Sequence, residues 1–79
     1  NPSTKITFSI KERDRVQIDV YNVLGQKVKT LLNDEKEPGL HSVVWYGKDD
    51  SGRNVASGIY FYRMTTSDYN RTNKMIFLK

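Results

Sequence analysis

The 79-residue sequence contains no cysteine and a single histidine, His41. The absence of cysteine excludes disulfides, thiolate metal ligands and thiol nucleophiles in this chain. The sequence also lacks the run of about 18 apolar residues that predicts a membrane-spanning helix. One histidine and six scattered serines, none in a nucleophile-elbow context, offer little for acid–base or nucleophilic chemistry. We therefore predict no catalytic site, no metal site and no cofactor.

The charged residues do not form a block of one sign. Thirteen basic and nine acidic residues give a net charge of +4, and most basic residues have an acidic neighbour, as in Lys11–Arg15. Mixed runs of this kind are typical of solvated turns and strand ends rather than of a nucleic-acid-binding stripe. We expect no nucleic-acid partner.

Apolar residues alternate with polar ones along most of the chain, which predicts half-buried β-strands. Ile6, Phe8 and Ile10 alternate with polar residues, so their side chains are expected on one face of a strand. The same alternation recurs in residues 15–20. We expect strands over residues 5–11, 15–20, 26–32, 40–46, 58–66 and 72–79. Turn residues separate them at intervals of roughly 8–12 residues, the spacing of an all-β sandwich. The predicted fold is a small antiparallel immunoglobulin-like β-sandwich of about seven strands, with residues 1–79 as a single domain.

Two polar segments lie between the expected strands. Residues 33–39 end in Pro38-Gly39 and are expected to form a loop. The second segment brings Asp49, Asp50, Ser51 and Asn54 together, so a calcium loop has to be considered. The alternating Asp-x-Asp-x-Asp-Gly pattern and a bidentate Glu are missing, however. A tight turn that needs no metal is the favoured interpretation.

The segment around Gly58 and the single tryptophan are expected to hold the fold together. Gly58 allows a sharp entry into a strand, and Tyr60 is positioned to bury its ring while its hydroxyl bonds an upstream backbone group, as in a tyrosine corner. Tyr62 shares the face of Tyr60, and Trp45 is expected to point inward. A base-stacking platform of the RNA-recognition type is the alternative, but it requires two helices and a basic residue where Ser57 stands.

The final run, Lys74–Lys79, has four consecutive apolar residues between two lysines. One interpretation is a terminal strand that is buried on both faces. The other is an exposed edge strand that is offered to another protein or to a second copy of the chain.

The order of several motifs resembles a known family. These are Asn1–Thr4, Val20–Val28, Pro38–His41 with Val43 and Trp45, Gly47–Met64 and Lys74–Lys79. Together they resemble the C-terminal sorting domain of type IX secretion cargo from the Bacteroidetes and related phyla. The central stretch is also similar to the immunoglobulin-like domain of the flagellar hook-capping protein. One departure is Tyr46, where such modules commonly have Asp.

The resemblance implies a non-catalytic C-terminal sorting and cell-surface anchoring module, cut from a larger exported protein. Its implied partners are the outer-membrane translocon, a surface sortase and a preceding cargo domain of the same chain. Its implied location is extracellular or on the outer-membrane surface. Independently of the resemblance, the exposed-edge interpretation of the last strand adds an edge-strand dimer to the expected partners. Translocon recognition would then fall on the terminal residues, which are Lys74, Met75, Ile76, Phe77, Leu78 and Lys79.

Three alternatives stay open at the level of sequence. The first is a structural immunoglobulin-like spacer of an extracellular multidomain hydrolase. The second is a hook-cap domain, which is less favoured because that protein holds the module mid-chain. The third is a carbohydrate-binding module, for which Tyr46 and Tyr69 are the candidate aromatic residues.

Overall fold

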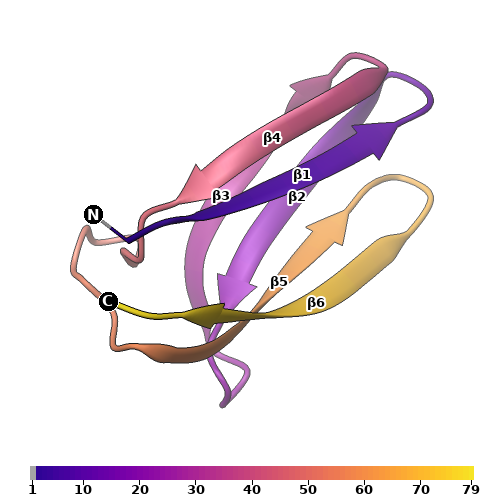
Figure 1. Cartoon of the computed structure of the whole chain (residues 1–79). Coiled ribbons are helices and arrows are strands. Elements are labelled where there is room, and N and C mark those ends of the chain that lie inside the picture. The colour runs from indigo at the N-terminus through magenta and orange to yellow at the C-terminus, as the bar shows by residue number, and fades with distance from the viewer. Residues whose placement is uncertain (1) are drawn as a thin grey trace.

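The computed structural model describes residues 2–79, which form six β-strands and no helix (Figure 1). Within these residues there is accordingly no helix that could cross a membrane. The strands are β1 (Thr4–Ile10), β2 (Asp14–Tyr21), β3 (Lys27–Lys36), β4 (Gly39–Trp45), β5 (Gly58–Thr65) and β6 (Asn70–Phe77).

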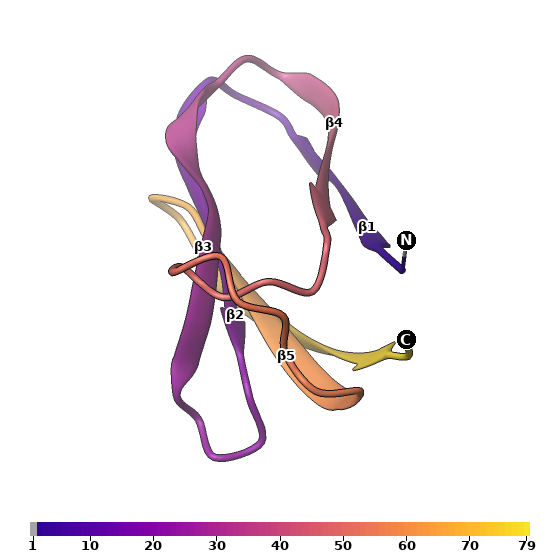
Figure 2. The ribbon, with the colours of Figure 1, turned by 90° about the vertical axis from the view of Figure 1, so that its left-hand side faces the viewer.

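The strands are arranged in two antiparallel sheets that face each other as layers (Figure 2). One sheet has only two strands, in the order β1-β4, and the other has four, in the order β3-β2-β5-β6. The predicted all-β, immunoglobulin-like sandwich is confirmed. The described chain has six strands instead of about seven, because residues 46–57 form turns that contain one isolated bridge, Lys48↔Asn54.

Strand β3 is longer than predicted. Residues 33–36 were expected in a loop, but they continue the pairing with β2 as far as Asp14↔Lys36. Only Glu37 and Pro38 connect β3 to β4. The prediction failed because β3 lies at a sheet edge and residues 33–35 are exposed, so this part of the strand has the polar composition of a loop.

The core consists of two clusters, whose members follow the alternation seen in the sequence. The first contains Ile6, Phe8, Val16, Ile18 and Met64. The second contains Val20, Trp45, Tyr60, Met75 and Phe77. Tyr62 is half-buried and packs against both clusters.

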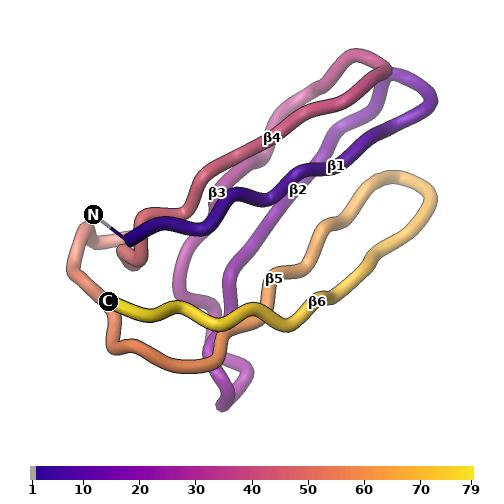
Figure 3. The backbone as a smooth tube through the Cα atoms, viewed as in Figure 1, coloured from indigo at the N-terminus to yellow at the C-terminus, as the bar shows by residue number. Residues whose placement is uncertain are grey.

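The terminal strand β6 lies at an edge of the four-stranded sheet. Met75 and Phe77 are buried in the core, whereas Ile76 is 62% exposed and Leu78 is 70% exposed. The interpretation of this run as a strand buried on both faces is therefore wrong. The start of β1 and the end of β6 lie at the same end of the sandwich (Figures 1 and 3).

Candidate interaction surface

Trp45 lies at the centre of the second core cluster and is 1% exposed. Its ring packs edge-on against Tyr60 and tilted against Phe77, with centroids 5.0 Å apart in both pairs. The indole Nε1–H donates a hydrogen bond of 2.9 Å to the carbonyl of Lys48. The indole therefore fixes the chain just beyond β4 as well as filling the core.

The Tyr60 side chain connects the start of β5 to the segment before it. Its ring is 8% exposed, and its hydroxyl donates a hydrogen bond of 2.7 Å to the Ala56 carbonyl. Gly58, between them, has φ of 154°, a conformation that side-chain-bearing residues rarely adopt. This is the geometry of a tyrosine corner. The Tyr62 hydroxyl lies further along β5 and accepts a hydrogen bond of 3.1 Å from the Asn73 side-chain amide.

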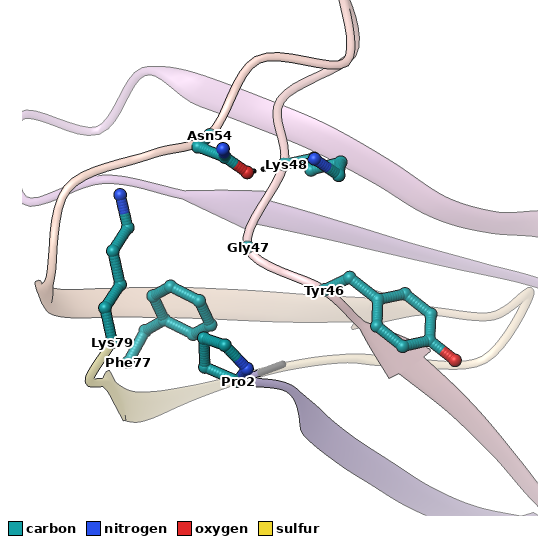
Figure 4. Close-up of a pocket in the computed structure, with 7 residues that line it drawn as sticks. All are labelled: Pro2, Tyr46, Gly47, Lys48, Asn54, Phe77 and Lys79. Carbon is teal, nitrogen blue, oxygen red and sulfur yellow. Dashed lines mark hydrogen bonds between the residues drawn. The ribbon is translucent and has the colours of Figure 1, made fainter.

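A shallow hollow of about 500 Å³ opens beside Gly47 and Phe77 (Figure 4). Its remaining lining residues are Pro2, Tyr46, Lys48, Asn54 and Lys79. The Lys48 ammonium donates a hydrogen bond of 2.9 Å to the Asn54 side chain. The lining combines aromatic and cationic groups without a carboxylate or an imidazole, so it can contact a ligand but supplies no acid–base pair.

Both aspartates of the turn after β4 accept hydrogen bonds from other groups of the chain. The Asp49 carboxylate accepts hydrogen bonds from the Ser51 hydroxyl (2.7 Å), the Ser51 N–H (2.9 Å) and the Arg53 N–H (2.9 Å). The Ser51 hydroxyl and the Arg53 N–H are the main reasons why the pKa of Asp49 lies below its usual value. Asp50 instead accepts the Thr30 N–H at 3.1 Å. Residues 2–79 contain no group of three or more His, Cys, Asp or Glu side chains placed to hold a metal.

Asp14 connects the start of β2 to the turn after β5. Its carboxylate accepts hydrogen bonds from the Ser67 hydroxyl (2.7 Å) and the Ser67 N–H (3.2 Å). The hydroxyl bond is the main reason why the pKa of Asp14 is lowered. This contact joins segments that are far apart in the sequence.

His41 is placed for packing. Its ring stacks on Phe8 with centroids 5.4 Å apart, and its Nε2–H donates a hydrogen bond of 2.6 Å to the Glu37 carbonyl. That bond spans the short β3–β4 connection.

The outer side of the four-stranded sheet carries an apolar surface across β2, β5 and β6. Tyr21 lies opposite Phe61, and Ile59 lies opposite Ile76, in the pairing of the strands. Ile59 is 43% exposed. We call these four residues, together with the exposed Leu78 that follows β6, the outer apolar face. Tyr21 and Phe61 are half-buried, whereas Ile59, Ile76 and Leu78 are exposed. Exposed apolar side chains that gather on one face are typical of contact surfaces.

Basic groups surround the outer apolar face. The Arg63 guanidinium lies 5.7 Å from the centroid of the Tyr21 ring, a cation–π distance. Lys74 lies opposite Phe61, and Lys27 lies opposite Tyr21. The neighbouring acid on this side, Asp19, is buried and accepts hydrogen bonds from Gln17 and Thr30. The surface is therefore apolar with a basic rim.

The six terminal residues proposed from the sequence do not form one surface. Lys74, Ile76 and Leu78 alternate with the core residues Met75 and Phe77, and the Lys79 N–H donates a hydrogen bond of 3.0 Å to the Ser57 hydroxyl.

Sequence reasoning missed three members of the outer apolar face, Tyr21, Ile59 and Phe61. The sequence did contain a sign of this face. These residues are apolar, but in the alternation of their own strands they occupy the positions that point away from the core. The carbohydrate-binding candidates Tyr46 and Tyr69 line different hollows, so they do not form a shared platform.

The two-layer sandwich and its tyrosine corner define an immunoglobulin-like domain. Comparison with known families refines this class, because the model of the FlgD Ig-like domain matches residues 2–69. The chain belongs to that family.

The chain is also similar to the crystal structure of FlgD from P. aeruginosa, with 26% identity and a TM-score of 0.74. The match covers 95% of this chain and 59% of that one. No curated protein matches the sequence.

The interpretation as a type IX sorting domain is wrong, because the matching family and the similar structure are both of FlgD. The similarity to the hook-capping protein's immunoglobulin-like domain is confirmed. The motifs that suggested sorting include Trp45 and the Gly58–Met64 stretch, which build the core and the tyrosine corner. They are features of the fold and do not identify an export signal.

Proposed function

We propose that this domain is a non-catalytic structural module that holds together parts of an extracellular protein assembly, as the FlgD Ig-like domain belongs to a flagellar hook-capping protein. This keeps the structural alternative raised from the sequence and adds a contact surface to it. Membership of the FlgD family and the outer apolar face support the proposal.

The outer apolar face carries the proposal. Ile76 and Leu78 are more exposed than buried, and the paired Ile59 extends their surface onto β5. Burying one such side chain completely contributes about 1.5–3 kcal/mol. The rim formed by Arg63, Lys74 and Lys27 favours a partner protein surface that is apolar at its centre and acidic around it. Such a contact fits an adjoining domain of the same assembly.

The polar groups support a structural role over a catalytic one. Asp49 accepts hydrogen bonds from Ser51 and from backbone amides of its own turn, and Asp14 accepts hydrogen bonds from the hydroxyl and the N–H of Ser67 in the turn after β5. His41 is engaged by a backbone carbonyl. None of these groups is held free at the edge of a hollow, as a general base would be.

A domain exchange tests the proposal. The immunoglobulin-like domain of P. aeruginosa FlgD would be replaced by residues 2–79 of this chain, and completed hooks would be counted by electron microscopy. We expect the chimera to restore hooks in a strain that lacks FlgD. If the folded chimera is present and no hooks form, a hook-cap role for this domain is contradicted.

The contact surface is tested within the same chimera. Ile59→Thr with Ile76→Thr keeps β-branched residues in both strands while removing apolar area. We expect this pair to reduce hook number strongly. The matched control is Ser42→Thr on the outer side of the two-stranded sheet, which should have no effect. Equal hook numbers for the two variants would show that the outer apolar face is not the contact surface.

A further inference from the structure

The two sheets differ in their number of strands, and β1 forms one edge of the smaller, two-stranded sheet. Strand β1 pairs with β4 on one side, and no strand within residues 2–79 pairs with its other side. The free edge of β1 lies on the same side of the sandwich as β6, the edge of the larger sheet (Figures 1 and 3).

Because the smaller sheet has no strand beyond β1, nothing in it covers the first half of β6. Residues 70–74 are all exposed. Arg71 and Asn73 nevertheless lie on the inner side of the sheet, because they pair with Met64 and Tyr62, whose face carries the core residue Tyr60. A strand beside β1 would lie over these positions.

A hollow of about 410 Å³ occupies this place. Phe8 of β1 and Met64 of β5 give it apolar walls, and both side chains are almost fully buried below its surface. Arg71 and Asn73 provide its polar side. Arg71 makes no ion pair with any residue in the described range 2–79. Along β1 the lining alternates between apolar residues and the hydroxyl residues Thr7 and Ser9, and along β6 it is cationic at Arg71.

The free edge of β1 also lacks the features that usually prevent strand addition. Its pairing with β4 is continuous, without a register shift, and Lys5 is its sole charged residue. The edge strand β3, in contrast, has two register shifts against β2 and contains charged residues at positions 34–36. The edge strand β6 carries Arg71 and Lys74.

We propose that an extended segment of a partner polypeptide adds to the free edge of β1 as a further strand. Alternate residues of this segment would be apolar and pack against Phe8 and Met64. An acidic residue among them would pair with Arg71. Backbone hydrogen bonds provide affinity in this mode of recognition, and the side-chain pattern provides specificity.

A partner segment fits this edge better than a second copy of the domain. Two β1 strands paired at about 4.8 Å would bring the uncovered ends of both β6 strands into the same space. A single strand occupies that space without a collision. This edge is separate from the outer apolar face, so failure of one proposal leaves the other intact.

The test uses the 79-residue chain labelled with ¹⁵N and a capped nine-residue peptide that alternates valine and threonine. At each end of the peptide, glutamate replaces one of the valines, so that its side chain lies on the same face as the remaining valines. We expect millimolar peptide to shift the amide resonances of β1, and to protect them from hydrogen exchange. A peptide with lysine in place of glutamate should bind several-fold more weakly, and Arg71→Glu should reverse this preference.

Two controls make the result decisive. A peptide of the same composition in scrambled order, without alternation, should bind much more weakly, because its apolar side chains no longer share one face. Asp34→Lys on the distant edge β3 should leave binding unchanged. Absence of β1 shifts with every peptide, or shifts confined to β3 or β6, would overturn the proposal. A dimer that forms without peptide and already protects the β1 amides would assign this edge to a second copy and would also overturn it.

Discussion

Replacing Gly47 by alanine tests how the terminal strand is held in the core. Gly47 has φ of 72°, and a Cβ atom at this position would overlap the ring of Phe77. Gly52 provides a matched control, because it has φ of 86° but no atom within 4 Å of the position of a Cβ. Both variants acquire the same kind of backbone strain, and only Gly47→Ala also displaces a core ring.

The magnitudes follow from these two contributions. An alanine in the left-handed region costs about 1–2 kcal/mol. Phe77 is 2% exposed and packs against Trp45, so displacing its ring adds an overpacking cost of about 1–3 kcal/mol. We expect Gly47→Ala to lower the free energy of unfolding by about 2–5 kcal/mol. The total for a chain of this length is about 4–12 kcal/mol.

Urea unfolding followed by Trp45 fluorescence measures both variants. Gly52→Ala should lower the midpoint modestly, and Gly47→Ala should lower it much further or leave the chain unfolded. Equal shifts in the two midpoints would refute the reasoning, because they would mean that Phe77 does not pack against Gly47.

Three further measurements test the fold. Tyr60→Phe should lower the free energy of unfolding by about 1 kcal/mol or more, since it removes a hydrogen bond from a buried hydroxyl, whereas Tyr62→Phe should cost less because its bond is exposed; equal costs would contradict the tyrosine corner. The pKa values of Asp14 and Asp49 are lower in the folded chain than the unfolded value of 3.8, so both carboxylates stabilise the fold above that pH, and this contribution is lost as the pH falls further. Asn variants at both positions should therefore flatten the decline in the free energy of unfolding below about pH 4. If the stability of the variants depends on acid pH as that of the original chain does, these contacts are not maintained in solution. Native Trp45 emission should be blue-shifted and poorly quenched by iodide, and solvent-like emission would place the indole outside the core.

The alternation of apolar residues was sufficient to predict the fold class. In β1 one face is buried and the other is largely exposed, and in β2 the apolar face is fully buried, so Ile6, Phe8 and Ile18 have the predicted inward orientation. The opposite face of β2 is more buried than the alternation predicts, because β2 lies between β3 and β5 and Asp19 on that face is buried. The method failed where a strand lies at an edge. Residues 33–36 of β3 are polar because one side has no neighbouring strand, and their sequence cannot be distinguished from that of a loop.

The candidate surface was less accessible to sequence reasoning. The four consecutive apolar residues within Lys74–Lys79 indicated a contact surface, but Met75 and Phe77 of that run belong to the core. The outer apolar face joins Tyr21, Ile59 and Ile76 across three strands, and only the pairing register brings them together. The motif order resembled a sorting domain because the same residues build any domain with this core.

The central claim is that the outer apolar face contacts a partner protein within a hook-cap-like assembly. Because the chain has no cysteine, Ile76→Cys introduces a single thiol into residues 2–79 of the FlgD chimera. The matched variant is Ser42→Cys on the opposite sheet. Cross-linking of assembled hooks with a short bifunctional reagent should produce an adduct from Ile76→Cys and little or none from Ser42→Cys. Adducts from Ser42→Cys alone, or equal yields from both, would contradict the claim.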